Sequence, residues 1–321
     1  MIRYVLNSLV ACALALIGSS LAAQTFPVKP VRILVPQTPG GASDALARVM
    51  AQKLSDKWGQ PVVVENRAGA GGNVGMEVVA QGAPDGYLLL MSYAGSHAIN
   101  PALYKRLPFD PVRDFAPVAT LATLPFVLVA RPDASFKTVA ELIEQAGKAN
   151  LTFGSAGNGS VNHLLGVMFA MNTGTRLTHV PYKGAAPAMQ DLMGGQINIV
   201  FTSLPSVAGL LRGGQLRALA VTSAQRSSTF AQIPTLAESG LKQFDIAPWF
   251  GLFAPGATPA AVVNRINQDV NELLKNSEVI EKFRSQGADP LARSPAEFAA
   301  MLRSDLAIWA EVVKTSGAQI D

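Results

Sequence analysis

Strand-like and helix-like stretches alternate along the chain, as judged by where the apolar residues fall. Residues 31–35 form a short continuous apolar run, which is typical of a buried strand. In residues 43–58 the apolar positions recur every three or four residues, which predicts an amphipathic helix. The same alternation continues, with strands expected at residues 62–64, 87–91, 126–130, 151–153, 197–201 and 216–221, and helices ending near residue 81, at 138–148, from about 160 and at 184–193. It predicts an α/β fold with mainly parallel sheets.

Two strand-like segments, one after Pro125 and one after Pro248, bracket the middle of the chain. A helix is expected after the second, with Thr258 as its N-cap and Pro259 in its first turn. Another is expected at residues 295–314. If these last helices return to the first half, two crossover strands join two lobes. The predicted division is residues 24–124 with 250–321 for lobe 1 and residues 125–249 for lobe 2.

The N-terminus has the three parts of a secretory signal. Arg3 supplies the positive charge, residues 9–17 the apolar core, and small residues follow, so residues 1–23 are predicted to be removed by cleavage near Ala22 or Ala23. The apolar core is too short for a membrane span. Cys12 is the only cysteine in the sequence. The mature chain therefore has no disulfide, no thiolate metal ligand and no cysteine nucleophile.

The loop around Pro39, Gly40 and Gly41 follows a predicted strand and precedes a predicted helix. Such a loop exposes backbone N–H groups at the positive end of the helix, where they can hold an anion. The alternative is an ordinary tight turn.

A second loop of the same kind covers residues 154–160, with three glycines, Ser155, Asn158 and Ser160. Its N–H groups and hydroxyls can converge on a carboxylate or phosphate, unless Ser160 only caps its own helix. Tyr182 and Lys183 precede another predicted helix and are also suited to an anion.

Signals for catalysis are weak. His163 lies three residues after Ser160, but neither Ser155 nor Ser160 has the flanking glycines of a nucleophile elbow. The glycine-rich residues 69–75 depart from the dinucleotide fingerprint, so no nucleotide cofactor is expected. The three histidines have no metal-ligand spacing, and no basic run suggests nucleic-acid binding. Binding without catalysis is favoured, with an exported Ser–His esterase as the alternative.

A set of short motifs spread over the mature chain resembles the substrate-binding receptors of the tripartite tricarboxylate transporter family, the Bug-type periplasmic solute receptors. These motifs are Val35-Pro36, Pro39-Gly40-Gly41-Ala42-Ser43-Asp44, Glu65-Asn66-Arg67, Gly69-Ala70-Gly71-Gly72-Asn73, Phe109-Asp110-Pro111, Gly154-Ser155-Ala156-Gly157, Val180-Pro181-Tyr182-Lys183-Gly184, Asp191-Leu192-Met193-Gly194-Gly195-Gln196 and Trp249-Phe250-Gly251-Leu252-Phe253-Ala254-Pro255.

The resemblance implies a two-lobed periplasmic binding protein that closes on a small carboxylate, with two interlobe crossover strands. It also implies no catalytic residues, no metal, a monomeric state and membrane permease subunits as partners. Carried onto this chain, the ligand-binding residues are Thr38, Gly40, Gly41, Ala42, Ser43, Asp44, Ser155, Ala156, Gly157, Asn158, Gly159, Ser160, Tyr182, Lys183 and Gly184, with Ser92, Ser96 and Ser203 as weaker candidates.

Two questions stay open at this stage. The flytrap architecture also serves ligand-sensing partners of membrane sensor kinases, so transport and sensing are not separated. The identity of the carboxylate is the second open question, because a site made of backbone amides recognises a carboxylate and not the rest of the molecule. Gln37 and Thr38 replace the aromatic or small apolar residues common before Pro-Gly-Gly, which makes the mouth of the pocket more polar.

Overall fold

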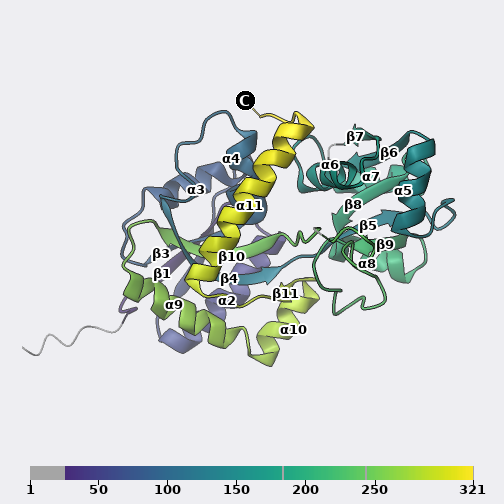
Figure 1. The fold of residues 1–321 in the computed structure, drawn as a ribbon. Helices are drawn as coiled ribbons and strands as arrows, with labels where there is room; N and C mark the ends of the chain where they lie inside the picture. The colour runs from purple at the N-terminus through teal and green to yellow at the C-terminus, as the bar shows by residue number, and fades with distance from the viewer. Residues whose placement is uncertain (1–25, 183, 243, 321) are drawn as a thin grey trace, which may run out of the picture.

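The computed structural model describes residues 26–182, 184–242 and 244–320, and it contains two β-sheets with helices packed around each (Figure 1). The predicted signal peptide and Lys183 lie outside the described residues. The first sheet has the strand order β11-β4-β10-β3-β1-β2 and the second has the order β7-β6-β8-β5-β9. We call each sheet with its helices a lobe.

The strands of the first sheet are β1 (Val31–Val35), β2 (Val62–Asn66), β3 (Leu88–Tyr93), β4 (Phe115–Thr123), β10 (Trp249–Pro255) and β11 (Asp289–Pro290). Those of the second are β5 (Phe126–Ala130), β6 (Leu151–Ser155), β7 (Leu177–Pro181), β8 (Ile199–Ser203) and β9 (Arg217–Val221).

Both sheets are mixed, so the prediction of mainly parallel sheets is wrong in that detail. Strand β1 pairs in parallel with β2 and β3, and β6 pairs in parallel with β7 and β8. In contrast, β10 runs antiparallel to β3 and β4, and β5 runs antiparallel to β8 and β9. Strands β5 and β10 are those by which the chain enters each sheet from the other lobe, and the short β11 also runs antiparallel to β4.

The chain crosses between the sheets twice, at the two places that the sequence indicates. Strand β4 ends at Thr123 and β5 begins at Phe126 in the other sheet, while β10 returns to the first sheet at Trp249. The two crossings are tied together, because the backbone N–H of Leu124 donates to the carbonyl of Pro248 at 2.9 Å. This hydrogen bond joins the two backbone segments that connect the lobes.

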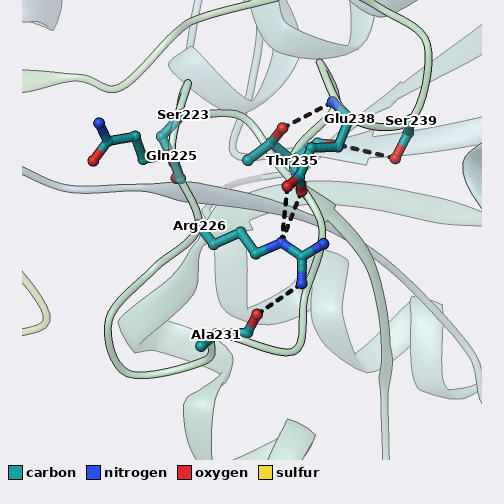
Figure 2. A network of polar contacts seen from close by, with 7 residues as sticks. All are labelled: Ser223, Gln225, Arg226, Ala231, Thr235, Glu238 and Ser239. Carbon is teal, nitrogen blue, oxygen red and sulfur yellow. Dashed lines mark hydrogen bonds and ion pairs between the residues drawn. The ribbon is translucent and has the colours of Figure 1, made fainter.

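The second crossing is long, covering residues 222–248, and a polar network gives it shape (Figure 2). The Arg226 guanidinium donates to the Glu238 carboxylate at 2.8 Å and to the Ala231 carbonyl at 3.0 Å. The same carboxylate accepts from the Thr235 N–H at 2.8 Å, and the Glu238 N–H donates to the Thr235 hydroxyl at 3.0 Å. The segment is thus ordered by charge-assisted hydrogen bonds in place of regular elements.

Helices cover both faces of the first sheet. One core contains α2 (Ala42–Trp58), α9 (Ala260–Leu273) and α10 (Ser277–Ser285). The other face carries η2 (Ala70–Gly72), α3 (Asn73–Ala80), η3 (Gly95–Ile99), α4 (Asn100–Leu103) and α11 (Pro295–Ser316). The second lobe holds α5 (Val139–Lys148), α6 (Val161–Thr173), α7 (Ala185–Met193) and α8 (Leu204–Arg212) (Figure 1). Helix α11 packs against β4, η3 and α4, and also against α6 of the second lobe.

Two predicted helix starts have different outcomes. Helix α11 begins at Pro295, as predicted, with Ser294 and Glu297 forming a capping box. Thr258 was predicted as the N-cap of α9, but Pro259 holds that position. The Thr258 hydroxyl instead donates to the carbonyl of Pro255 at 2.7 Å, closing the turn that follows β10. Among the described helices, none is long and apolar enough to cross a membrane.

Candidate functional site

The loop between β1 and α2 is held in shape by the carboxylate of Asp44. One oxygen accepts hydrogen bonds from the Gly40 N–H and the Arg48 Nε, both at 3.0 Å, and the other accepts from the Asn66 side chain at 2.9 Å. Burial by itself would raise the pKa of Asp44, but these hydrogen bonds, with the Arg48 charge, lower it overall. Asp44 therefore shapes the loop, and its oxygens are occupied by partners within the first lobe.

The first turn of α2 has no side-chain cap. Its N-cap is Gly41, so no side chain caps the helix, and Ala42 and Ser43 supply the first N–H groups. Gly40 has a φ of 87°, a conformation that glycine adopts without strain. The turn therefore presents backbone donors at the positive end of a 17-residue helix, as the sequence predicts.

The two serines after β3 are engaged within the first lobe. The Ser96 hydroxyl donates to the Gly71 carbonyl at 2.7 Å and accepts from Gln37 at 3.2 Å, so it links η2 to the β1–α2 loop. Ser92 is fully buried, 3.2 Å from the Nδ1 of His97. Both were candidate ligand residues, and both hydroxyls have protein partners in this conformation.

The glycine-rich loop at η2 has a structural reason for its composition. Gly72 has a φ of 104°, and a Cβ atom added there would lie 2.5 Å from the Ser96 hydroxyl. Only glycine allows the backbone to approach Ser96 this closely. The loop thus supports the β1–α2 turn through Ser96 and Gln37.

In the second lobe, the loop between β6 and α6 satisfies most of its own polar groups. The Gly157 N–H donates to the Ser155 hydroxyl at 3.1 Å, and the Ser160 hydroxyl donates to the Gly157 carbonyl at 2.7 Å. Ser160 is also the N-cap of α6, accepting from the His163 N–H at 3.2 Å. The sequence left open whether Ser160 caps its own helix, and in the structure it does. We call the β1–α2 loop the first wall and the β6–α6 loop the second wall. More of the polar groups of the second wall are bonded within the protein.

Two histidines bond to this loop. The sequence singled out His163 but not His179. The Nδ1 of His163 accepts from the Gly159 N–H at 3.1 Å, and the Nε2 of His179 lies 2.6 Å from the Ser155 hydroxyl. The imidazole rings stack with centroids 3.9 Å apart, on Phe153. Burial, and then the His179 charge, lowers the pKa of His163 to about 4, and burial lowers the pKa of His179.

The Ser155–His179 contact is the closest approach to a catalytic pair around these loops. Ser155 is fully buried, and its hydroxyl is shared with the Gly157 backbone. In the described structure, no hydrogen bond joins His179 to a carboxylate that would orient it, as a triad requires. Nor do the described residues contain a group of three or more His, Cys, Asp or Glu side chains able to hold a metal ion.

The remaining candidates lie at the carboxyl ends of β7 and β8, the two strands on either side of β6. The Tyr182 hydroxyl donates to Asp191 at 2.6 Å, and burial, with that carboxylate, raises the pKa of Tyr182 to about 12. Gly184, with a φ of 135°, is the N-cap of α7, and no side chain caps that helix. Ser203 is the N-cap of α8, and its hydroxyl contacts that of Ser206.

The carboxyl ends of β1 and β3 thus carry one group of candidates, and those of β6, β7 and β8 carry the other. The lobes meet beside the second group, where a Cβ atom added to Gly159 would lie 2.9 Å from the Leu103 side chain of α4. A cavity of about 820 Å³ opens next to this contact, between α6, the edge strand β7 and the residues after α11. Asn158, His163 and His179 line it, with Arg176 at its rim.

Comparison with known proteins gives one consistent result. The profile of the family described as tripartite tricarboxylate transporter family receptor matches residues 46–318. BugT of Bordetella pertussis is 38% identical over 311 residues, covering 96% of this chain and 95% of BugT.

Two solved structures are similar over nearly the full chain. Rpa4515 of R. palustris, solved with adipate, is 36% identical with a TM-score of 0.75, covering 92% of this chain and 100% of that one. MatC (Rpa3494) of Rhodopseudomonas palustris, solved with bound malate, is 32% identical with a TM-score of 0.70, covering 90% and 100%. The matches span both lobes and confirm the two-lobed fold.

Proposed function

Because this chain belongs to the tripartite tricarboxylate transporter receptor family, we propose that it captures a small carboxylate between its lobes and delivers it to membrane permease subunits. The observation that carries the proposal is the family match across residues 46–318. Adipate and malate are both dicarboxylates, and each is bound by a full-length structural relative. The ligand class proposed here is therefore a small organic acid with one or two carboxylates.

The two walls would bind the carboxylate differently. On the first, the N–H groups at the start of α2 face an anion with roughly half a positive charge behind them. On the second, the start of α7 is also free of a side-chain cap, whereas the residue 155–160 loop has most of its donors engaged. Closure of the lobes would exchange the hydration of the ligand for these amides, and the closed form would be recognised at the membrane.

The finer parts of the proposal follow from the same reasoning. Lobe 1 would comprise residues 24–124 and 250–321, and lobe 2 residues 125–249, with the hinge at Leu124 and Pro248. Residues 1–23 would direct export to the periplasm and be cleaved near Ala22 or Ala23. The receptor would act as a monomer, without enzymatic activity. A sensor kinase in place of the permease is the alternative partner, and neighbouring genes would separate the two.

The first test is a thermal-shift screen of residues 24–321, unfolded and refolded to remove bound ligand. The panel contains malate, adipate, other small carboxylates, NAD and a simple ester. A rise in melting temperature with carboxylates and none with NAD is expected, since a ligand that binds the folded state stabilises it. No response to any carboxylate from a folded sample, or hydrolysis of the ester, would contradict the proposal.

A substitution that removes one donor tests the first wall. Ala42→Pro deletes the N–H at the first position of α2, where proline is tolerated, and Gly41 before it is extended. Affinity for the best carboxylate of the panel should fall about tenfold, since a hydrogen bond to a charged group contributes about 1.5–3 kcal/mol.

The matched control is Ser277→Pro, at the first position of α10, which is exposed and distant in sequence from both loops. It should leave the affinity unchanged. Equal effects of the two substitutions would show that the start of α2 does not contact the ligand.

A further inference from the structure

The proposed binding of a carboxylate gives no role to two histidines, of which His163 is buried and His179 is half-buried. His163 and His179 belong to different elements, α6 and β7, yet they stack face to face and each bonds to the β6–α6 loop. Phe153 of β6 stacks on His179 with centroids 4.9 Å apart. Nothing in the resemblance or in the mechanism above explains why this loop should be supported by two imidazoles.

We propose that His163 and His179 are positioning residues that hold residues 155–160 in their ligand-binding form only while both imidazoles are neutral, so that ligand affinity falls in mild acid. This inference rests on the proposed carboxylate-binding function and adds a pH response to its second wall.

The bond to His163 fixes the protonation state of that ring. Its Nδ1 accepts the Gly159 N–H at 3.1 Å, so Nδ1 must carry a lone pair and the ring proton must be on Nε2. A second proton on Nδ1 would place two N–H groups against each other. Gly159 has a φ of 75°, and a Cβ atom added to it would lie 2.9 Å from the Leu103 side chain, so the loop has little room to turn this amide elsewhere.

The bond to His179 sets the direction of a short hydrogen-bond chain. The Gly157 N–H donates to the Ser155 hydroxyl, and this hydroxyl donates to the Nε2 of His179, 2.6 Å away, when the neutral ring carries its proton on Nδ1. If Nε2 were protonated, the ring would donate to Ser155, and the hydroxyl proton would turn to the Gly157 carbonyl, 3.2 Å away. Protonation of His179 therefore rearranges the bonds that hold Gly157.

The surroundings oppose a positive charge at either ring. His163 is buried and His179 is half-buried, and at a centroid distance of 3.9 Å a charge on one ring disfavours a charge on the other. Among the described residues that line the adjacent cavity, Arg176 carries a charge, and it is also positive. On α7, the acid that meets the end of β7 is Asp191, which is engaged by Tyr182.

Two kinds of variant separate this role from simple packing. His163→Asn keeps an acceptor at the position of Nδ1 but does not titrate, whereas His163→Leu removes the acceptor. His179→Gln places an amide at the position of Nε2. The double variant His163→Asn/His179→Gln therefore retains the bonding pattern without the titration.

The experiment measures the affinity for malate and for adipate by calorimetry at pH 7.5 and pH 5. For each ligand, the affinity at pH 7.5 is divided by the affinity at pH 5. This ratio should be at least tenfold larger for the wild type than for the double variant. The ionisation of the ligand is the same in both proteins, so it cancels in this comparison. His163→Leu should bind weakly at both pH values, and His163→Asn should restore part of the loss at pH 7.5.

A second measurement needs no ligand. The amide hydrogen-exchange protection of Gly157 and Gly159, corrected for the intrinsic exchange rate, should fall at least tenfold between pH 7.5 and pH 5 in the wild type. The double variant should show no such fall.

The outcomes distinguish this inference from the proposed function. Equal affinity ratios in the wild type and the double variant would overturn the role of the histidines and leave carboxylate binding intact. If neither malate nor adipate binds at pH 7.5, the exchange measurement decides the inference by itself. Protection that is independent of pH would then overturn it.

Discussion

The two candidate ligand loops share a position in the fold but are held by opposite chemistry. Each follows a parallel strand and leads into a helix, α2 in one lobe and α6 in the other. An ionised carboxylate, Asp44, organises the first loop, and neutral imidazoles with the Ser160 cap organise the second.

This difference determines what each loop offers a ligand. Asp44 bonds to the loop and to side chains, which leaves the first N–H groups of α2 without a side-chain cap. In the second loop, the amides of Gly157 and Gly159 and the cap of α6 are already bonded. If both loops bind the carboxylate as proposed, the first offers free backbone donors at once, and the second must exchange internal bonds as it binds.

The largest effect is expected from removing the anchor of the first loop. Asp44→Ala leaves the Gly40 N–H and Arg48 without their carboxylate and takes one of the two acceptors of the Asn66 amide, and it should lower the free energy of unfolding by about 3 kcal/mol. Urea denaturation measures this change. Asp133→Ala, which removes an exposed partner of Arg131, is the control and should change the stability little.

If Asp44→Ala proves as mild as the control, the carboxylate does not organise the loop. The contrast between a charged and a neutral anchor would then fail.

Acid should release the second loop before the first. A histidine whose pKa is lowered on folding adds stability above its unfolded pKa of 6.5, and this stability is lost as the pH falls towards the folded value of about 4 for His163. The loss is of order 2 kcal/mol. Asp44 has a pKa below its usual 3.8, so its contribution persists until the pH falls further.

Hydrogen exchange at single amides is the suitable measurement, because global unfolding also reports His97. Burial lowers the pKa of that histidine in the first lobe to about 4 as well. Between pH 7 and pH 4.5, protection should fall at Gly159 and persist at Ala45, whose N–H bonds to the Gly41 carbonyl. Simultaneous loss at both would remove the distinction between the loops.

A smaller effect separates capping from ligand binding. Ser160→Ala removes the N-cap of α6 and should cost about 1 kcal/mol of stability. Thr138→Ala removes the corresponding cap of α5 in the same lobe and should cost about as much. Only the first should also change carboxylate affinity, as measured by calorimetry. A change in affinity with both, or with neither, would mean that Ser160 acts as a helix cap alone.

Most regular elements could be predicted from the apolar pattern, and the exceptions have physical causes. The pattern places β1, α2, β5, α5 and α11 within a residue or two of their observed bounds. Strand β4 was missed because its sequence is rich in alanine and contains Pro117, which lies where the pairing with β10 is irregular. Strand β7 and helix α10 were missed because each is short, with five and nine residues.

The candidate site could likewise be predicted only in part. Glycine, proline and serine placed between a strand and a helix were enough to locate both loops, since only a few residue types form such turns. The sequence did not indicate that Asp44 serves the loop, or that Ser160 and Ser155 are engaged inside the second wall. Those roles depend on which groups lie within 3 Å of each other, and residue type does not specify that distance.

The environment of His179 shows the difference between what local sequence determines and what only the tertiary structure determines. Local pattern establishes strands, helices, the turns between them and the two crossings, because periodicity and turn chemistry act over neighbouring residues. The pairing of Phe153 with His179 arises from the register of β6 against β7. That register brings together residues 26 positions apart, and with it the ring stack and the contact with Ser155. Only the folded sheet decides it, because the energy that fixes the register comes from packing across elements.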